Sequence, residues 1–216
     1  MTTTPTIPRP RTPSDSRNDS PPRAASVLAV TARPGQESAD LGGLLYTFRR
    51  AGASLSLLSL TRGEAAGQNS ASARLEAVRP WETQLAASIL GIRSIAIANY
   101  RDGGLPEYPT AELAERIGRA IRESSADLVV VVAPEAGDRA DAVVARAAEA
   151  AAAAAGVSAI AHTRPGVPGA WTLDLGADAE TARAIQKSAA AAHASQSEAL
   201  PALIGRLDLL GRGETL

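Results

Sequence analysis

The sequence predicts an α/β fold: an open, mainly parallel sheet of Rossmann-like type with helices on both faces. Residues 127–133 form a continuous, valine-rich apolar run, which is typical of a strand buried on both faces of a parallel sheet. Residues 110–123 place Leu113, Ile117 and Ile121 at the spacing of one buried helix face. Segments of these two kinds alternate along the chain, and this alternation favours a doubly wound parallel sheet.

The other elements follow from apolar runs, turn residues and helix stops. The expected strands are 27–30, 54–60, 94–98, 127–133, 157–161 and 171–175. The expected helices run from the turn at 34–37 to about residue 50, and over 72–90, 110–123, 141–155, 177–194 and 200–210. Within 72–90, Leu75, Val78, Leu85 and Ile89 suggest a rough apolar stripe, and Pro80 is expected to kink or split the helix.

Length and composition favour one α/β domain with a tail. Residues 1–24 are rich in Thr, Ser, Arg and Pro and lack the apolar core of a signal peptide, so we expect them to be disordered. Residues 25–216 are then a single domain. No stretch has the roughly eighteen uninterrupted apolar residues of a membrane span, which predicts a cytoplasmic protein with no membrane partner.

Charge and residue counts exclude several kinds of site. The formal net charge is −1, so the chain has no electrostatic footprint for nucleic acid. The absence of cysteine excludes disulfides and thiolate metal sites. His162 and His193 are the only histidines and lie far apart in the sequence, so a multi-histidine metal site is hard to build.

The turn after the first strand is the expected place for a ligand. Pro34 and Gly35 break the apolar run, and acidic and capping residues follow in what should be the first turn of a helix. A strand, a tight turn and a helix N-terminus together place this turn at the carboxyl edge of a parallel sheet. Open α/β sheets bind their ligands at that edge.

Three spaced motifs carry a family resemblance. They read Ala-Arg-Pro-Gly-Gln-Glu at 32–37, Gly-Asp-Arg-Ala-Asp at 137–141, and Ala-His-Ala-Ser-Gln at 192–196. In these motifs the chain resembles the PIG-L/LmbE family of zinc-dependent sugar N-deacetylases, from about residue 26 onward. That family typically has Ala-His-Pro-Asp-Asp-Glu at the first motif and Gly-His-Pro-Asp-His at the second. Several motifs in the right order are more specific than any one alone.

The resemblance also implies that the family's chemistry has been altered here. Arg33 stands at the position of a zinc-binding His, Gln36 at that of a zinc-binding Asp, and Asp141 at that of the third ligand. Gly35 replaces the catalytic base, and Asp138 replaces a His that helps at the oxyanion. One carboxylate does not make a tetrahedral zinc site, so we expect a protein without zinc, unlike intact family members.

Two structural hypotheses follow for the altered positions. Arg33 and Asp141 could form a bidentate ion pair across the vacant metal site, linking the two loops. Alternatively, both side chains are simply solvated. A different reading keeps a metal, because Glu37, Asp138 and Asp141 would offer three oxygen donors suited to magnesium or manganese.

Three functions remain open. The favoured one is a non-catalytic protein that binds a small, sugar-like molecule or has a regulatory role. The second is an active metal-dependent N-deacetylase or amidohydrolase with an atypical site. The third is a homo-oligomeric scaffold that uses the Ala-rich helix 141–155. The candidate substrate-binding residues are Glu37, Arg74, Asp102 and His193.

Overall fold

The computed structural model describes residues 22–64, 72–135, 137–162, 172–173, 175–196 and 214–215, and for 72–77 the helical backbone alone. Five parallel strands form the main sheet: β1 (Ser26–Thr31), β2 (Ser54–Thr61), β3 (Ser94–Tyr100), β4 (Leu128–Val132) and β5 (Ser158–His162). A separate antiparallel pair consists of β6 (Thr172–Leu173) and β7 (Glu214–Thr215). Most of the predicted tail and the predicted helix 200–210 lie outside the described residues.

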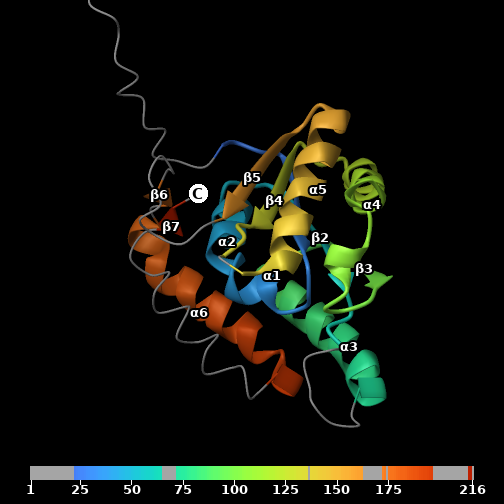
Figure 1. Cartoon of the computed structure of the whole chain (residues 1–216). Coiled ribbons are helices and arrows are strands. Elements are labelled where there is room, and N and C mark those ends of the chain that lie inside the picture. Colours follow the sequence, from blue (N-terminus) through green and yellow to red (C-terminus); the bar gives the residue numbers. More distant parts are fainter. Residues whose placement is uncertain are drawn as a thin grey trace, which may run out of the picture.

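Six α-helices accompany the strands within the described part of the chain. They are α1 (Gln36–Ala39), α2 (Gly42–Arg50), α3 (Ser72–Leu90), α4 (Thr110–Ser124), α5 (Arg139–Ala155) and α6 (Ala179–Ala191). Helices α4 and α5 cover one face of the sheet, and α2, α3 and α6 cover the other (Figure 1). The predicted α/β fold with a parallel sheet and helices on both faces is therefore confirmed.

Strand β1 lies at the centre of the sheet, and every residue of it after Ser26 is buried. It pairs in parallel with β2 on one side and with β4 on the other, giving the order β3-β2-β1-β4-β5. Val27 and Ala29 point into one core and Leu28 and Val30 into the other, as alternation along a strand requires. The chain order reverses between β1 and β4, so the carboxyl ends of these two strands form the switch point of the sheet.

The expected helix after β1 is broken into α1 and α2. The break occurs where α6 approaches most closely. The Gln186 side chain on α6 donates to the Ala39 carbonyl oxygen at 2.9 Å, so that oxygen serves a tertiary contact at the end of α1. A Cβ atom on Gly42 would lie 2.6 Å from Gln186 Cγ, so only glycine allows this approach.

The predicted apolar stripe on α3 is wrong at two of its four positions, although Ile89 does pack against the core, and the side chain of Leu75 lies outside the described residues. Val78 and Leu85 are 43% and 56% exposed. The buried face is offset from them and consists of Arg79, Glu82, Thr83, Ala86, Ala87 and Leu90. The two alanines let the helix lie close to the hydrophobic core, and the polar residues turn toward the carboxyl edge of the sheet. Pro80 does not split the helix, which continues from Ser72 to Leu90.

The Ala-rich sequence of α5 is explained by packing inside the molecule. Ala147, Ala148, Ala151 and Ala152 are buried against α4 and the sheet, where small side chains allow close helix packing. The helix ends at Gly156, which adopts a left-handed conformation with φ of 70°, as predicted. No helix within the described ranges is long and apolar enough to cross a membrane.

Candidate functional site

The candidate site lies at the switch point, where the turn after β1 meets the loop between β4 and α5 (Figure 1). Side chains of α1 fold the turn onto itself. Gln36 Oε1 accepts hydrogen bonds from the backbone N–H groups of Ala32 and Arg33 at 3.0 and 3.2 Å. Glu37 Oε2 accepts from the N–H of Gly35 at 2.8 Å. The polar residues of this turn therefore hold backbone groups in place.

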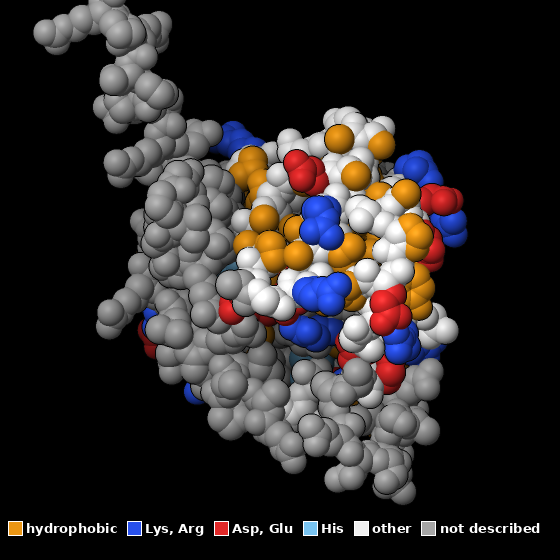
Figure 2. All heavy atoms as spheres, in the orientation of Figure 1, with side chains coloured by type: hydrophobic (Ala, Val, Ile, Leu, Met, Phe, Trp, Pro, Cys, Tyr) orange, Lys and Arg blue, Asp and Glu red, His pale blue; other side chains and the backbone are white. Residues whose placement is uncertain are grey.

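An ion pair links the turn to α5, although its partner differs from the predicted one. Arg33 Nη2 lies 3.0 Å from Asp138 Oδ2, whereas we expected Asp141 as the partner. Asp138 is the N-cap of α5, and its Oδ1 accepts a hydrogen bond from the Asp141 N–H at 3.0 Å. The other carboxylate oxygen, Oδ2, pairs with Arg33. Basic and acidic side chains reach the surface near this end of α5 (Figure 2).

Asp141 accepts hydrogen bonds from Gln36 instead. The carboxamide nitrogen of Gln36 lies 2.9 and 3.0 Å from the two carboxylate oxygens of Asp141, which is 6% exposed. The two loops are thus joined by two pairs, Arg33–Asp138 and Gln36–Asp141. We call these four residues the loop cross-link. The alternative in which these side chains are merely solvated does not describe the structure.

Charge in the loop cross-link shifts the pKa of both members of the Arg33–Asp138 pair toward the charged form. Partial burial lowers the pKa of Arg33, but the carboxylates of Asp141 and Asp138 outweigh it, so the pKa lies above its usual value. Burial raises the pKa of Asp138, yet the hydrogen bond from the Asp141 N–H and the Arg33 charge bring it below its usual value. Arg33 and Asp138 therefore both stay charged at neutral pH.

The residues of the loop cross-link do not fit a zinc ion. A guanidinium has no lone pair to offer, and the Gln36 oxygen already accepts two backbone hydrogen bonds. The Asp141 carboxylate is engaged by the Gln36 nitrogen. The alternative oxygen set is not assembled either, because Glu37 is committed elsewhere. Within the ranges that the structure describes, no three His, Asp or Glu side chains are grouped so that they could share one metal ion.

Gly35, the residue that the resemblance places at the family's catalytic base, lies where a side chain would be strained and crowded. Gly35 has φ of 100°, a conformation that side-chain-bearing residues rarely adopt. A Cβ atom there would lie 3.2 Å from Gln196 Oε1 and 3.3 Å from Gln196 Nε2. A carboxylate at this position would require Gln196 to move.

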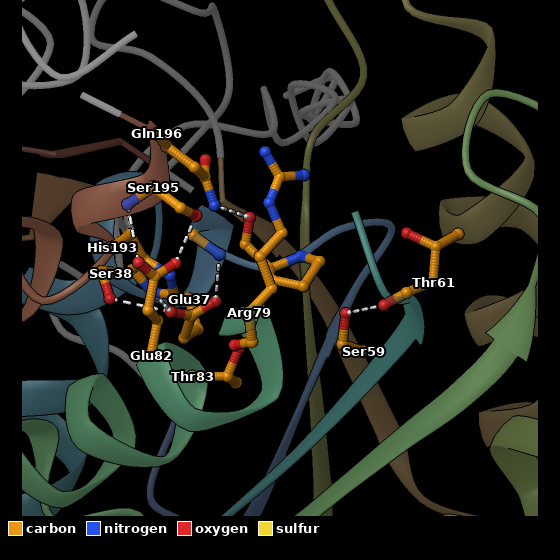
Figure 3. A network of polar contacts seen from close by, with 12 residues as sticks. Glu37, Ser38, Ser59, Thr61, Arg79, Glu82, Thr83, His193, Ser195 and Gln196 are labelled. Carbon is orange, nitrogen blue, oxygen red and sulfur yellow. Dashed lines mark hydrogen bonds and ion pairs between the residues drawn. The ribbon is translucent and has the colours of Figure 1, made fainter. Parts of the chain in front are cut away.

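A second polar network joins the same turn to the segment around His193 and to α3 (Figure 3). Glu37 Oε1 is 2.6 Å from His193 Nε2, and both side chains are completely buried. Ser38 Oγ also donates to Glu37 Oε1, at 2.8 Å. The structure thus places Glu37 and His193, two of the candidate substrate-binding residues, away from solvent and against each other.

The segment after His193 is attached to α3 and to the turn. It forms the 3₁₀ helix η3 (Ala194–Gln196). Ser195 donates to Glu82 through both its backbone N–H and its hydroxyl, each at 2.6 Å, and Gln196 Nε2 donates to the Pro34 carbonyl oxygen at 3.2 Å. We call this network, with Glu37 and His193, the C-terminal latch.

The sequence analysis missed Glu82 and its neighbour Arg79. Arg79 is buried beside the turn: a Cβ atom on Gly63 would lie 2.7 Å from its Nη1. Burial lowers the pKa of Arg79, and the nearby carboxylates of Asp102, Glu82 and Glu64 oppose that shift. The sequence feature that could have indicated them is the spacing of Arg79 and Glu82, a charged pair at i and i+3 on the helix face that also carries Ala86.

The other two candidate substrate-binding residues are Asp102 and Arg74, and the structure describes the side chain of Asp102 only. The backbone N–H of Asp102 donates to Glu64 Oε1 at 2.9 Å, which ties the loop after β3 to the loop after β2. The Asp102 carboxylate is near enough to both Arg33 and Arg79 for its charge to raise the pKa of each. The side chain of Arg74 is outside the described residues.

Comparison with solved structures places this fold among deacetylases and one hydratase. A deacetylase of the teicoplanin biosynthesis pathway matches with a TM-score of 0.72 and 17% identity, over 88% of this chain and 96% of that one. The N,N′-diacetylchitobiose deacetylase from Pyrococcus horikoshii, bound to an inhibitor, matches with a TM-score of 0.62 and 16% identity, over 83% and 76%. GalB, a 4-carboxy-2-hydroxymuconate hydratase from Pseudomonas putida, matches with 0.67 and 16%, over 85% and 82%.

Comparison by sequence was made with curated proteins and with models of protein families. No curated protein matches the chain by sequence. The model of the PIG-L family, described as GlcNAc-PI de-N-acetylase, matches residues 28–163, which is more than half of the chain and includes both strands of the switch point. The predicted resemblance is thus confirmed, and the chain belongs to the PIG-L family.

Proposed function

We propose that this protein binds a small, sugar-like molecule without hydrolysing it, and that its site works without the zinc ion of catalytic family members. The observation that carries this proposal is the loop cross-link. Arg33, Gln36, Asp138 and Asp141 occupy the family's ligand and oxyanion positions, and each one has a hydrogen-bonding partner within this set. Because these side chains already hydrogen-bond to one another, no metal ion is needed to hold the two loops together.

The chemistry of amide hydrolysis supports the same conclusion. Hydrolysis needs a polarised carbonyl, a base for the attacking water, and positive or hydrogen-bond-donating groups at the developing oxyanion. Gly35 offers no base. The Asp138 carboxylate, at the oxyanion position, would repel developing negative charge. The base and the group at the oxyanion position thus lack the residues that would perform these two functions.

The groups at the site suit hydroxyl and amide ligands. Arg33 is 42% exposed despite its ion pair, so its remaining N–H groups can donate to a ligand oxygen. Asp138, 26% exposed, and the partly buried Asp102 offer carboxylate acceptors on the same edge of the sheet. The names of the structural neighbours include a deacetylase of an acetylated disaccharide and a hydratase of a different substrate, so this fold can host more than one kind of small ligand.

The test combines metal content, hydrolysis and binding on one preparation. Untagged protein is dialysed against trace zinc and manganese, and metal per chain is measured by elemental mass spectrometry. Acetate release and saturation-transfer NMR are then measured with N-acetylglucosamine and N,N′-diacetylchitobiose. We expect far less than one metal per chain, no acetate release, and saturable binding that weakens in Asp102→Ala. Near-stoichiometric metal together with acetate release would overturn the proposal, and so would the absence of binding to both sugars.

A further inference from the structure

We propose that α3 carries a homodimer interface, in which an exposed apolar stripe packs against the same stripe of a second copy. The stripe consists of Val78, Trp81 and Leu85, which are 43%, 74% and 56% exposed. The spacing i, i+3, i+7 places all three on one side of the helix. An exposed tryptophan between two exposed aliphatic residues is typical of a contact surface rather than of ordinary solvent-facing helix.

The charge of this surface favours a second copy over a charged partner. Between Pro80 and Leu90 the only charged residue is Glu82, and its carboxylate is turned inward and bound to Ser195. The other exposed side chains in this stretch, Gln84 and Ser88, are uncharged. Interface centres are depleted of charge, and a central stripe without exposed charge can meet its own copy with no like-charge repulsion at the centre of the contact.

The order of the stripe suits two-fold symmetry. In an isologous contact the same patch is used by both copies, so a residue that contacts another is contacted by it in return. Val78 and Leu85 stand on either side of Trp81 along the helix. Antiparallel packing of two α3 helices about an axis near Trp81 therefore places Val78 against Leu85 of the second copy, and the two tryptophans at the centre.

The area beside the stripe allows a complete interface. A stable dimer buries about 800 Å² on each partner, and the three side chains supply on the order of 300 Å² of this. The surface continues into a shallow groove between α3 and α6, lined by Ile89 of α3 and by Glu180, Thr181, Ala184, Ile185 and Ser188 of α6, with Glu180 as its one charged residue. This groove can supply much of the remaining area. By contrast, the small side chains of α5 that suggested an oligomer surface are largely used inside the fold.

Sedimentation velocity of the full-length chain over a range of concentrations tests the interface. We expect a concentration-dependent dimer in the wild type. Leu85→Glu places a charge at the interface and should raise the dimer Kd at least about 30-fold. Ala154→Glu adds the same charge to the exposed side of α5 and should leave Kd unchanged. A monomer at every concentration would overturn the proposal, as would a dimer that resists Leu85→Glu or is broken by Ala154→Glu.

Tryptophan fluorescence identifies the residue that is covered. The chain has two tryptophans, so Trp171→Phe leaves Trp81 as the only one. Its emission should shift to shorter wavelength as the dimer forms, over the same concentration range. A short-wavelength emission already present in dilute monomer would mean that the chain covers its own stripe, and it would overturn the proposal. An emission that does not change on dimerisation would place the interface elsewhere and also overturn it.

Discussion

The two charged pairs beside the turn at 32–37 differ in burial. In the loop cross-link, the Arg33 and Asp138 side chains are 42% and 26% exposed. In the C-terminal latch, Glu37 and His193 are completely buried. The difference teaches that the turn is held by a buried pair toward α6 and by a partly solvated pair toward α5. The loss of a buried latch contact should therefore affect folding, and the loss of a cross-link contact should affect it less.

Glu37→Ala should have the largest effect. The Glu37 carboxylate accepts hydrogen bonds from the Gly35 N–H and the Ser38 hydroxyl and pairs with His193, all in a buried environment. Its removal leaves buried polar groups without partners and a cavity in place of the side chain. We expect a loss of about 3–5 kcal/mol in the free energy of unfolding, measured by urea denaturation followed by circular dichroism.

Glu37→Gln is the matched control, because it keeps the shape and removes the charge. Burial raises the pKa of Glu37, but the hydrogen bond and charge of His193 outweigh it and bring the pKa below the usual 4.5. A carboxyl group whose folded pKa is lowered contributes stability above its unfolded pKa and loses that contribution as the pH falls. The stability difference between wild type and Glu37→Gln should thus shrink as the pH falls from about 5 to about 3. A difference that does not depend on pH would contradict this account.

Asp141→Asn should have an intermediate effect. The carboxylate is buried, accepts two hydrogen bonds from the Gln36 carboxamide, and its negative charge raises the pKa of Arg33. A hydrogen bond to a charged group contributes about 1.5–3 kcal/mol, and we expect a loss of that size in the free energy of unfolding. A chelator should leave the Tm of both proteins unchanged. Equal stability of the variant and the wild type would show that the cross-link does not stabilise the loops.

Sequence reasoning predicted the sheet, and it predicted that the turn after β1 lies beside the loop before α5, because hydrophobic period and turn residues indicate which strand ends meet. It predicted that Arg33 would cross to the loop before α5, but it chose Asp141 over Asp138. Spacing identifies which loops face each other, whereas the partner depends on side-chain direction and on the N-cap role of Asp138. The pair between Glu37 and His193 spans 156 residues, a separation that no local pattern reports. The buried face of α3 was missed because its small and charged residues carry no hydrophobic signal.

Arg33→Ala should have the smallest effect, and it separates the two networks most clearly. The Arg33–Asp138 pair is partly exposed, so solvent screens it and its contribution should be about 0.2–1 kcal/mol. Because such a pair is sensitive to ionic strength, the stability difference between wild type and variant should shrink further at about 1 M salt.

A double-mutant cycle with Asp138→Ala gives the coupling directly. Asp138→Ala alone should be more damaging, by about 1 kcal/mol, because it also removes the N-cap of α5. The cap contribution cancels in the cycle, and the coupling that remains belongs to the ion pair. A coupling well above about 1 kcal/mol would mean that the two pairs do not differ as their burial indicates, and that the Arg33–Asp138 pair also holds the fold together.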